Sequence, residues 1–181
     1  MIIEETKLKG CFILQPQVYQ DSRGYFFESF NQETFKSKLG FSPNFVQDNE
    51  SKSSKGVLRG LHYQLGVYAQ SKLIRVVNGS ILDVVVDVRK DSKTYGECFS
   101  IEISSTNKKQ LYIPKGFAHG FLVLEDDTVI NYKCDNFYNK AYEAGIIYND
   151  ADLAIDWNFP MNSLILSDKD KALPEFKNIR L

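Results

Sequence analysis

The sequence predicts a mainly β protein, an antiparallel sandwich, jelly roll or barrel with a few short helices. Short apolar or alternating runs follow one another closely and are separated by turn residues. Aromatic residues, which favour strands, make up 13% of the 181 residues. No repeat, low-complexity tract or linker divides the chain. We therefore expect a single domain over 1–181, with a core at about 10–150 and an extension with a short helix at 151–181.

The runs with the length and composition of strands are 10–14, 24–29, 56–64, 72–77, 80–88, 97–103, 110–113, 120–124, 129–134 and 144–148. Asn78-Gly79 joins two of them as a two-residue hairpin, because both central positions of such a turn adopt positive φ. In 80–88, Leu82, Val84, Val86 and Val88 share one face, whereas Asp83, Val85 and Asp87 share the other. That second face could meet solvent, a partner subunit or a wet pocket.

Two short helices interrupt the strands. Asn31 is a suitable N-cap for a helix whose apolar face is Phe35 and Leu39, and Gly40 ends it. The stretch 167–170 resembles a second helix start, with a serine N-cap and acidic residues in the first turn.

Charge and cysteine content exclude several classes of protein. The 22 basic and 23 acidic residues give a formal charge of -1, so the chain has no net positive electrostatic field that would attract nucleic acid or an anionic membrane surface. No apolar run approaches the roughly 20 residues of a membrane span, and the N-terminus lacks the apolar core of a signal peptide. Three distant cysteines form no disulfide framework, which favours a cytoplasmic location. The chain has only two histidines, His62 and His119, so we expect no transition-metal site.

The segment 57–64 places a cation and an imidazole in one strand. Strict alternation would put Arg59 and His62 on opposite faces. If both serve one pocket, Gly60 marks a bulge that redirects them. The alternative is that Arg59 faces water and His62 is a hydrogen-bonded core residue.

Other candidates also have ordinary structural explanations. His119 lies where the loop at 113–117 joins a strand, and a backbone carbonyl could hold it. Tyr132 could be a core aromatic, Asp170 a capping residue, and Lys72 a solvated strand end. In 21–29, a carboxylate stands among aromatic side chains, at Glu28, and the nearby Arg23 is its candidate partner.

Taken together, these segments resemble the dTDP-4-dehydrorhamnose 3,5-epimerase family, the third enzyme of dTDP-L-rhamnose synthesis. The matching stretches are 21–30, 45–49, 57–64, 113–121, 132–133 with 136–138, and 166–170. They occur in the family's order over nearly the whole chain. The resemblance implies a cupin-type jelly roll or double-stranded β-helix, a homodimer, no metal and no organic cofactor. Gln64 stands where metal-binding cupins typically have a second histidine.

The resemblance also implies roles for single residues. His62 resembles the general base, Asp170 its orienting carboxylate, Tyr132 the acid on the opposite face, and Lys72 the group beside the C4 carbonyl. The positions that resemble substrate-binding residues are Arg23, Glu28, Gln47, Asn49, Arg59, Lys72, His119, Tyr138, Glu143 and Lys169, with Tyr138 stacking on thymine. The chain departs from the family at Glu50, where many members have histidine, and this leaves the substrate contacts at that position open.

The implied substrate is a dTDP-4-keto-6-deoxy sugar. Protons at C3 and C5 are removable because both carbons flank the C4 ketone, and the resulting charge moves onto its oxygen. A histidine suits the base because its usual pKa of about 6.5 lies near operating pH. Arginines would bind the pyrophosphate with forked donors. The alternatives are a 3-epimerase or ketoisomerase on the same fold, a non-catalytic sugar-binding jelly roll and, less favoured, a metal-dependent cupin dioxygenase.

Overall fold

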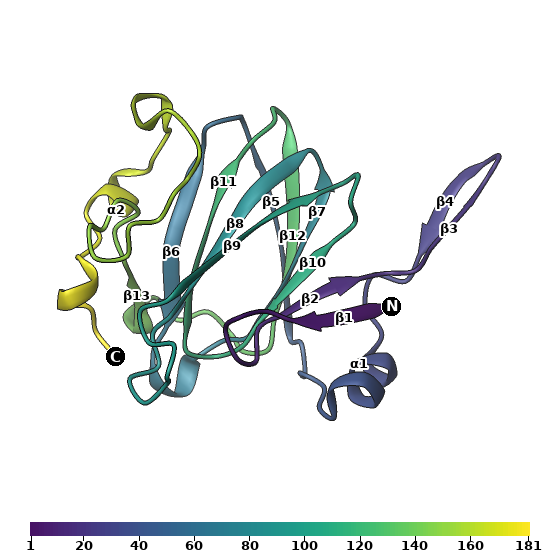
Figure 1. Cartoon of the computed structure of the whole chain (residues 1–181), viewed down its shortest axis with the longest axis horizontal. Coiled ribbons are helices and arrows are strands. Elements are labelled where there is room, and N and C mark those ends of the chain that lie inside the picture. The colour runs from purple at the N-terminus through teal and green to yellow at the C-terminus, as the bar shows by residue number, and fades with distance from the viewer.

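Two antiparallel sheets that pack face to face form the body of this computed structural model, which describes residues 1–181 (Figure 1). The six-stranded sheet has the order β1 (Ile2–Glu5), β2 (Phe12–Gln15), β10 (Gln110–Ile113), β7 (Lys72–Asn78), β12 (Thr128–Cys134) and β5 (Gln47–Ser53). The five-stranded sheet has the order β13 (Glu143–Gly145), β6 (Leu58–Gln64), β11 (Phe117–Val123), β8 (Ser80–Asp87) and β9 (Cys98–Ser104). This arrangement confirms the predicted antiparallel β architecture and has the form of a cupin-like jelly roll.

The five-stranded sheet is buried on both faces. Val85 on β8 belongs to the apolar cluster between the two sheets, whereas its neighbour Val84 packs outward. The outward cluster includes Trp157 and Leu153 of the C-terminal segment, which covers this sheet. Asp83 therefore lies on the face of β8 that points into the sandwich. The sequence left solvent, a partner subunit or a wet pocket open for this face, and the structure shows an internal, partly polar pocket.

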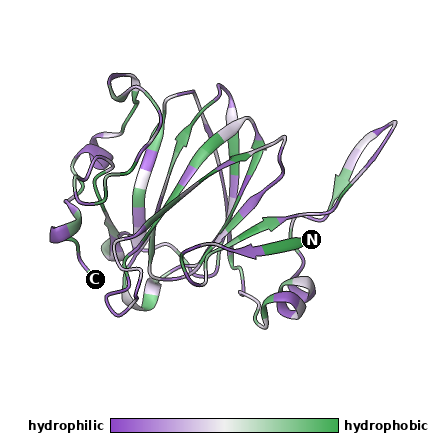
Figure 2. Cartoon of the chain, viewed as in Figure 1, coloured by the Kyte–Doolittle hydropathy of each residue, from purple (hydrophilic) through white to green (hydrophobic).

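Helix α1 (Gln32–Leu39) begins and ends as the sequence predicts. The Asn31 side chain accepts a hydrogen bond from the Thr34 amide, and Gly40 ends the helix in the left-handed region with φ of 76°. Figure 2 shows that α1 is mostly hydrophilic, and its one buried residue is Phe35. Phe35 packs with Leu14, Leu73 and Tyr112 on the outer face of the six-stranded sheet.

Strands β3 (Val18–Asp21) and β4 (Gly24–Phe27) form a hairpin that projects from the body as an arm (Figure 1). Tyr19, Tyr25 and Phe26 on this arm are exposed. Exposed aromatic side chains in a cluster are typical of a surface that another molecule covers.

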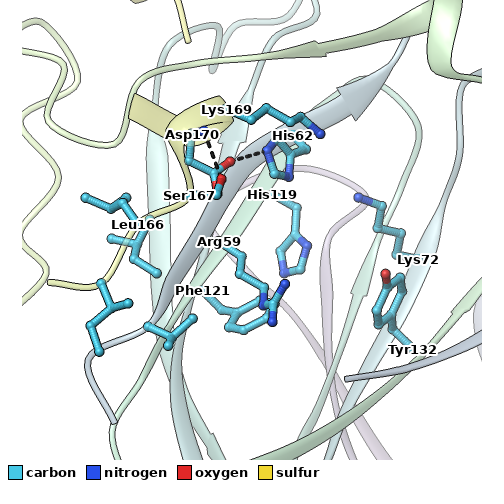
Figure 3. Close-up of a pocket in the computed structure, with 13 residues that line it drawn as sticks. Arg59, His62, Lys72, His119, Phe121, Tyr132, Leu166, Ser167, Lys169 and Asp170 are labelled. Atoms are coloured by element: carbon cyan, nitrogen blue, oxygen red, sulfur yellow. Dashed lines mark hydrogen bonds and ion pairs between the residues drawn. The ribbon is translucent and has the colours of Figure 1, made fainter. Parts of the chain in front are cut away.

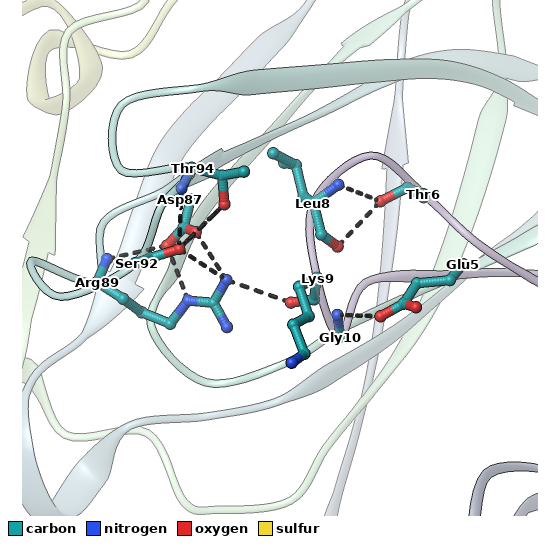
Figure 4. A network of polar contacts seen from close by, with 9 residues as sticks. All are labelled: Glu5, Thr6, Leu8, Lys9, Gly10, Asp87, Arg89, Ser92 and Thr94. Atoms are coloured by element: carbon teal, nitrogen blue, oxygen red, sulfur yellow. Dashed lines mark hydrogen bonds and ion pairs between the residues drawn. The ribbon is translucent and has the colours of Figure 1, made fainter.

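A buried carboxylate holds the end of β8 (Figure 4). Asp87 accepts hydrogen bonds from Arg89, Ser92 and Thr94, at 2.6 Å from Arg89 Nη2 and from both hydroxyls. Arg89 also donates to the carbonyl of Lys9, which ties the loop after β8 to the β1–β2 turn. Burial alone would raise the pKa of Asp87, but these donors lower it from 3.8 to about 2.

Strands β1, β3 and β5 are not among the strands predicted from the sequence. The residues of β5 are all polar, because its inner side chains face a cavity and its outer ones face solvent, so hydrophobic alternation is absent. The last predicted strand, 144–148, is shorter than expected and is observed as β13. The C-terminal helix α2 (Asp168–Lys171) forms where predicted. None of the helices is both long and apolar enough to cross a membrane.

Candidate active site

A cavity of about 610 Å³ opens between the two sheets at the side covered by the C-terminal segment. The five-stranded sheet contributes Arg59, His62, His119 and Phe121, the six-stranded sheet contributes Lys72 and Tyr132, and the C-terminal segment contributes Ser167, Lys169 and Asp170. Figure 3 shows His62 beside Asp170 at one part of this cavity and Lys72 beside Tyr132 at another. The predicted catalytic residues thus converge from three separate parts of the fold.

A bulge in β6 directs Arg59 and His62 into the same cavity, as the sequence analysis considered. His62 pairs with His119 and Arg59 pairs with Phe121, so three steps on β6 match two on β11. The extra residue removes the strict alternation of side chains. Gly60 has φ of 116°, and a Cβ there would lie 2.6 Å from the Cα of Gly120. Glycine is therefore required at this close approach.

His62 is oriented by the short helix α2. Its Nε2 lies 2.6 Å from Oδ1 of Asp170, and the Ser167 hydroxyl donates to Oδ2 of the same carboxylate at 2.7 Å. Ser167 also caps α2 by accepting from the Asp170 amide. Burial would raise the pKa of Asp170, but hydrogen bonds from His62 and Ser167 bring it below its usual value. Asp170 therefore takes part in the cap of α2 and also holds the His62 ring by a hydrogen bond.

His119 forms a second histidine–aspartate pair. Its Nε2 lies 2.6 Å from Oδ1 of Asp83, which is fully buried on β8. Asp83 was predicted on the polar face of its strand but not as a site residue. The signal that could have found it was an acidic residue inside an otherwise apolar strand.

Lys72 and Tyr132 lie on neighbouring strands of the six-stranded sheet. Burial lowers the pKa of Lys72 and raises that of Tyr132. Burial thus acts against the charged form of each side chain. The alternative explanation of Lys72 as a solvated strand end is wrong, because its side chain lines the cavity. Tyr132 packs against the inner apolar cluster, as a core aromatic would, and also lines the cavity.

An adjoining cavity of about 290 Å³ shares His62, Lys72 and Tyr132 with the first. Its other lining residues include Gln47, Asn49, Tyr138 and Glu143. The Tyr138 hydroxyl donates to Glu143, and Lys169 makes an ion pair with the same carboxylate. Burial would raise the pKa of Glu143, but these contacts lower it overall.

Arg59 is a cation of the cavity without a carboxylate partner. Its Nη2 donates to the Ser53 hydroxyl at 3.1 Å, and no ion pair involves it. A guanidinium in this situation keeps donors available for an anionic ligand.

Two predicted substrate-binding residues lie outside both cavities. Arg23, on the β3–β4 arm, pairs with Asp21 at 2.6 Å, and its side chain is 88% exposed. Glu28, at the base of the arm, accepts a hydrogen bond from Asn31. The expected pairing of Glu28 with Arg23 is therefore wrong. Each group instead finds a nearer partner, Arg23 across the hairpin turn and Glu28 at the cap of α1.

Glu50, the departure from the family pattern, is exposed and lies on the outer face of β5. Its inward neighbours Asn49 and Ser51 alternate with it. The chain contains no group of three or more histidine, cysteine, aspartate or glutamate side chains arranged to hold a metal ion.

Comparisons with known proteins agree with this geometry. The family model described as dTDP-4-dehydrorhamnose 3,5-epimerase matches residues 5–178. The Escherichia coli K12 protein of that name is 51% identical over 174 residues, which are 96% of this chain and 93% of the relative.

Two crystal structures have the same fold. The dTDP-4-dehydrorhamnose 3,5-epimerase of Elizabethkingia anophelis has a TM-score of 0.95 and 51% identity, with 98% of this chain and 97% of that chain covered. The dTDP-6-deoxy-D-glucose-3,5-epimerase of Legionella pneumophila, in complex with dTDP-4-keto-L-rhamnose, has a TM-score of 0.94 and 44% identity, with 99% and 94% covered. The chain belongs to the dTDP-4-dehydrorhamnose 3,5-epimerase family.

Proposed function

We propose that this protein is an isomerase that converts dTDP-4-dehydro-6-deoxy-D-glucose to dTDP-4-dehydro-L-rhamnose by inverting C3 and C5, in dTDP-L-rhamnose biosynthesis. One observation carries this proposal. An imidazole oriented by a carboxylate and a phenol beside an ammonium group come from opposite sheets and line one cavity. Inversion of a carbon α to a ketone requires this arrangement of a base, an acid and a group that stabilises the enolate oxygen.

His62 is the base of the proposed reaction. When its Nε2 donates to Asp170, the other ring nitrogen is free to accept a proton. The Asp170 carboxylate remains ionised because its pKa is lowered, and it stabilises the imidazolium that forms after abstraction. His62 takes the proton from C5 or C3, and the electron pair moves onto the C4 oxygen.

Tyr132 returns a proton on the opposite face of the sugar. Burial raises the pKa of its hydroxyl, so the phenol stays protonated at neutral pH and can donate to the enolate carbon. Lys72 is beside it and stabilises the oxygen that carries the enolate charge, as preorganised donors do in such sites. These side chains supply every proton that moves, so the proposal includes no metal and no organic cofactor.

The nucleotide lies toward the rim of the two cavities in this proposal. Arg59 binds the pyrophosphate with its unpaired donors. Tyr138, which is half exposed, offers its ring to the thymine, and Gln47, Asn49, Glu143 and Lys169 complete the polar lining.

We further propose a homodimer in which the arm of one copy reaches the cavity of the other. The arm carries exposed aromatic side chains and the cation Arg23, yet it contacts neither cavity of its own chain. A second copy would cover these aromatic side chains and would bring Arg23 to the bound nucleotide. We also propose that 1–181 acts as a single catalytic domain, because α2 in the extension supplies Asp170. A cytoplasmic location stays a prediction.

Incubation of the enzyme with the keto sugar in deuterium oxide tests the reaction. We expect deuterium at both C3 and C5, measured by mass spectrometry and proton NMR. Label at one carbon would indicate a 3-epimerase, a 3-keto product would indicate a ketoisomerase, and binding without label would indicate a sugar-binding module. Each of these outcomes would overturn the double epimerase.

Mixing two inactive variants tests the arm. Arg23→Ala leaves the catalytic groups intact but removes the arm's cation, and His62→Ala leaves the arm intact. In a mixed dimer, one cavity combines the intact base of the first variant with the intact arm of the second. Activity that rises after mixing supports the shared site, whereas the sum of the separate activities contradicts it.

A further inference from the structure

Helix α2 carries Asp170, yet it is too short to hold this residue in place by itself. It spans only Asp168–Lys171, and a helix of one turn is not stable without tertiary contacts. The hydrogen bond from the Asp170 amide to the Ser167 hydroxyl lies within the same turn. The position of Asp170 relative to His62 therefore depends on what ties α2 to the rest of the fold.

Strand β13, which pairs with β6, provides two of these ties. Its residue Gly145 lies beside His62 in the register of the two strands. A Cβ at Gly145 would lie 2.8 Å from a methyl carbon of Leu173, so this leucine packs directly on the strand backbone. Two residues earlier on β13, Glu143 accepts a hydrogen bond from the Lys169 ammonium group at 2.5 Å. Lys169 and Leu173 thus dock the α2 segment along β13.

Glu143 also holds the ring that the proposed function gives to the thymine. The Tyr138 hydroxyl donates to Oε2 of Glu143 at 3.1 Å, while Lys169 donates to Oε1. At the other end of the residue, the Tyr138 amide donates to the Gln47 side chain of β5. Burial would raise the pKa of Glu143, but Lys169 and Tyr138 lower it overall, so the carboxylate stays ionised and accepts from both. The ring is therefore fixed at both ends.

One carboxylate thus connects the nucleotide end of the site to the proposed base. The contacts run from the Tyr138 hydroxyl through Glu143 to Lys169 of α2. The next residue of α2, Asp170, orients His62. Figure 3 shows Lys169 and Asp170 extending from α2 on the side of the cavity where His62 lies. Stacking of a base requires the ring of Tyr138 but not its hydroxyl, so stacking alone leaves this group without a role.

We propose that Glu143 is a positioning residue that couples Tyr138 to α2, so that thymine stacking on the ring steadies the carboxylate that orients His62. This inference rests on the proposed epimerase function. Its consequence is that binding energy from a part of the substrate that does not react raises kcat, and not only the affinity.

Amide hydrogen exchange of α2, followed by NMR with dTDP as the probe, tests the coupling without turnover. In the wild-type enzyme we expect saturating dTDP to slow exchange of the Asp170 amide about 5-fold, a value at the low end of coupling between two sites. In Tyr138→Phe, which keeps the stacking ring, dTDP should bind but leave this rate unchanged. Direct contact of the diphosphate with Lys169 predicts the opposite result, because such a contact does not need the hydroxyl.

Deuterium exchange into the keto sugar measures the effect on the reaction. We expect Tyr138→Phe to lower kcat about 5-fold and to change KM by less than about 3-fold, because the ring and the phosphate contacts remain. Glu143→Gln should lower kcat by at least as much. The double variant should have the kcat of Glu143→Gln alone, since both changes break the same path.

Lys171→Met is the matched control for Lys169→Met. Both lysines lie on α2, but Lys171 pairs with Asp168 of the same helix and lies outside both cavities. Without dTDP, Lys169→Met should speed up exchange of the Asp170 amide about 3-fold, as expected for loss of one ion pair near the surface. Lys171→Met should leave both this rate and kcat at their wild-type values.

The outcomes distinguish the coupling from the function on which it rests. If dTDP protects the Asp170 amide equally in wild type and Tyr138→Phe, or if this variant has wild-type kcat, the coupling is wrong. Equal effects of Lys169→Met and Lys171→Met overturn it as well. If Glu143→Gln does not fold, Tyr138→Phe decides, because its ring is half exposed. If the wild-type enzyme labels neither carbon, the epimerase function fails, while hydrogen exchange with dTDP still decides the coupling.

Discussion

The two sheets contribute to the site in different ways. On the five-stranded sheet, His62 and His119 are each held by an aspartate at 2.6 Å. On the six-stranded sheet, Lys72 and Tyr132 have no ion pair, and burial is the largest influence on the pKa of each. One wall of the cavity is therefore organised by histidine–aspartate hydrogen bonds and the other by burial of side chains without an ion pair.

This difference fits the two halves of the proposed reaction. A base must keep one nitrogen free and its ring fixed, which a hydrogen-bonded carboxylate achieves. An acid and an oxyanion donor are most effective when their protons are not already shared with the protein. We therefore expect substitutions on the two walls to have different kinetic signatures.

Substitution of the base should have the largest effect. We expect His62→Ala to reduce deuterium exchange at both C3 and C5 by about 10⁴-fold, because general base catalysis is lost at both carbons. The measurement is proton NMR of the keto sugar in deuterium oxide. The variant should keep its fold, since His62 lies at the cavity wall and not in either apolar cluster.

A Glu50→Gln variant is the control for this experiment, because Glu50 is exposed on the outer face of β5. Its exchange rates should equal those of the wild type. Exchange that persists at one carbon in His62→Ala would show that a second base serves that carbon.

On the opposite wall, Tyr132→Phe should separate the two halves of the reaction. We expect product formation to fall about 100-fold, because the returning proton is lost. Loss of the substrate proton to solvent should fall much less, because His62 and Asp170 are unchanged. Normal turnover in this variant would remove Tyr132 from the acid role and would leave the paired wall as the source of both protons.

The bulge in β6 gives a test based on stability. We expect Gly60→Ala to destabilise the protein by roughly 2 to 3 kcal/mol, because a Cβ there meets Gly120 backbone at 2.6 Å and the φ of 116° disfavours alanine. Urea unfolding measures this change. Gly24→Ala is the matched control, since φ there is 130° but nothing lies within 4 Å of the added Cβ. Equal losses in both variants would show that backbone strain, and not the close approach, is the cause.

Local chemistry made much of the site predictable. The capping pattern at 167–170 located α2, and Gly60 between Arg59 and His62 suggested the bulge that the register confirms. The resemblance to a family named His62, Lys72, Tyr132 and Asp170, and the structure brings them to one cavity. Their assigned roles stay predictions until the variants are measured.

The remaining features depend on tertiary contacts that sequence periodicity does not record. Strand β5 is entirely polar because its inner face lines a cavity, so the usual signal of a strand is absent. Asp83 is recognisable as a site residue only when β11 places His119 beside it. Arg23 lies outside both cavities of its own chain, and one sequence does not say what its arm contacts.

The smallest effect concerns acid stability, where the two sheets should again differ. The pKa of Asp87 in the five-stranded sheet is lowered from 3.8 to about 2, so its contribution is complete above about pH 4 and disappears as the pH falls through 2. This shift corresponds to about 2 kcal/mol. Between pH 5 and pH 2, the free energy of unfolding measured with urea should therefore fall by about 2 kcal/mol less in Asp87→Asn than in the wild type. Asp127→Asn breaks only an exposed ion pair with Lys52 on the six-stranded sheet. Its free energy of unfolding should therefore change with pH as that of the wild type does. If the free energy of unfolding of Asp87→Asn changed with pH as in the wild type, groups other than Asp87 would cause the acid sensitivity of the fold.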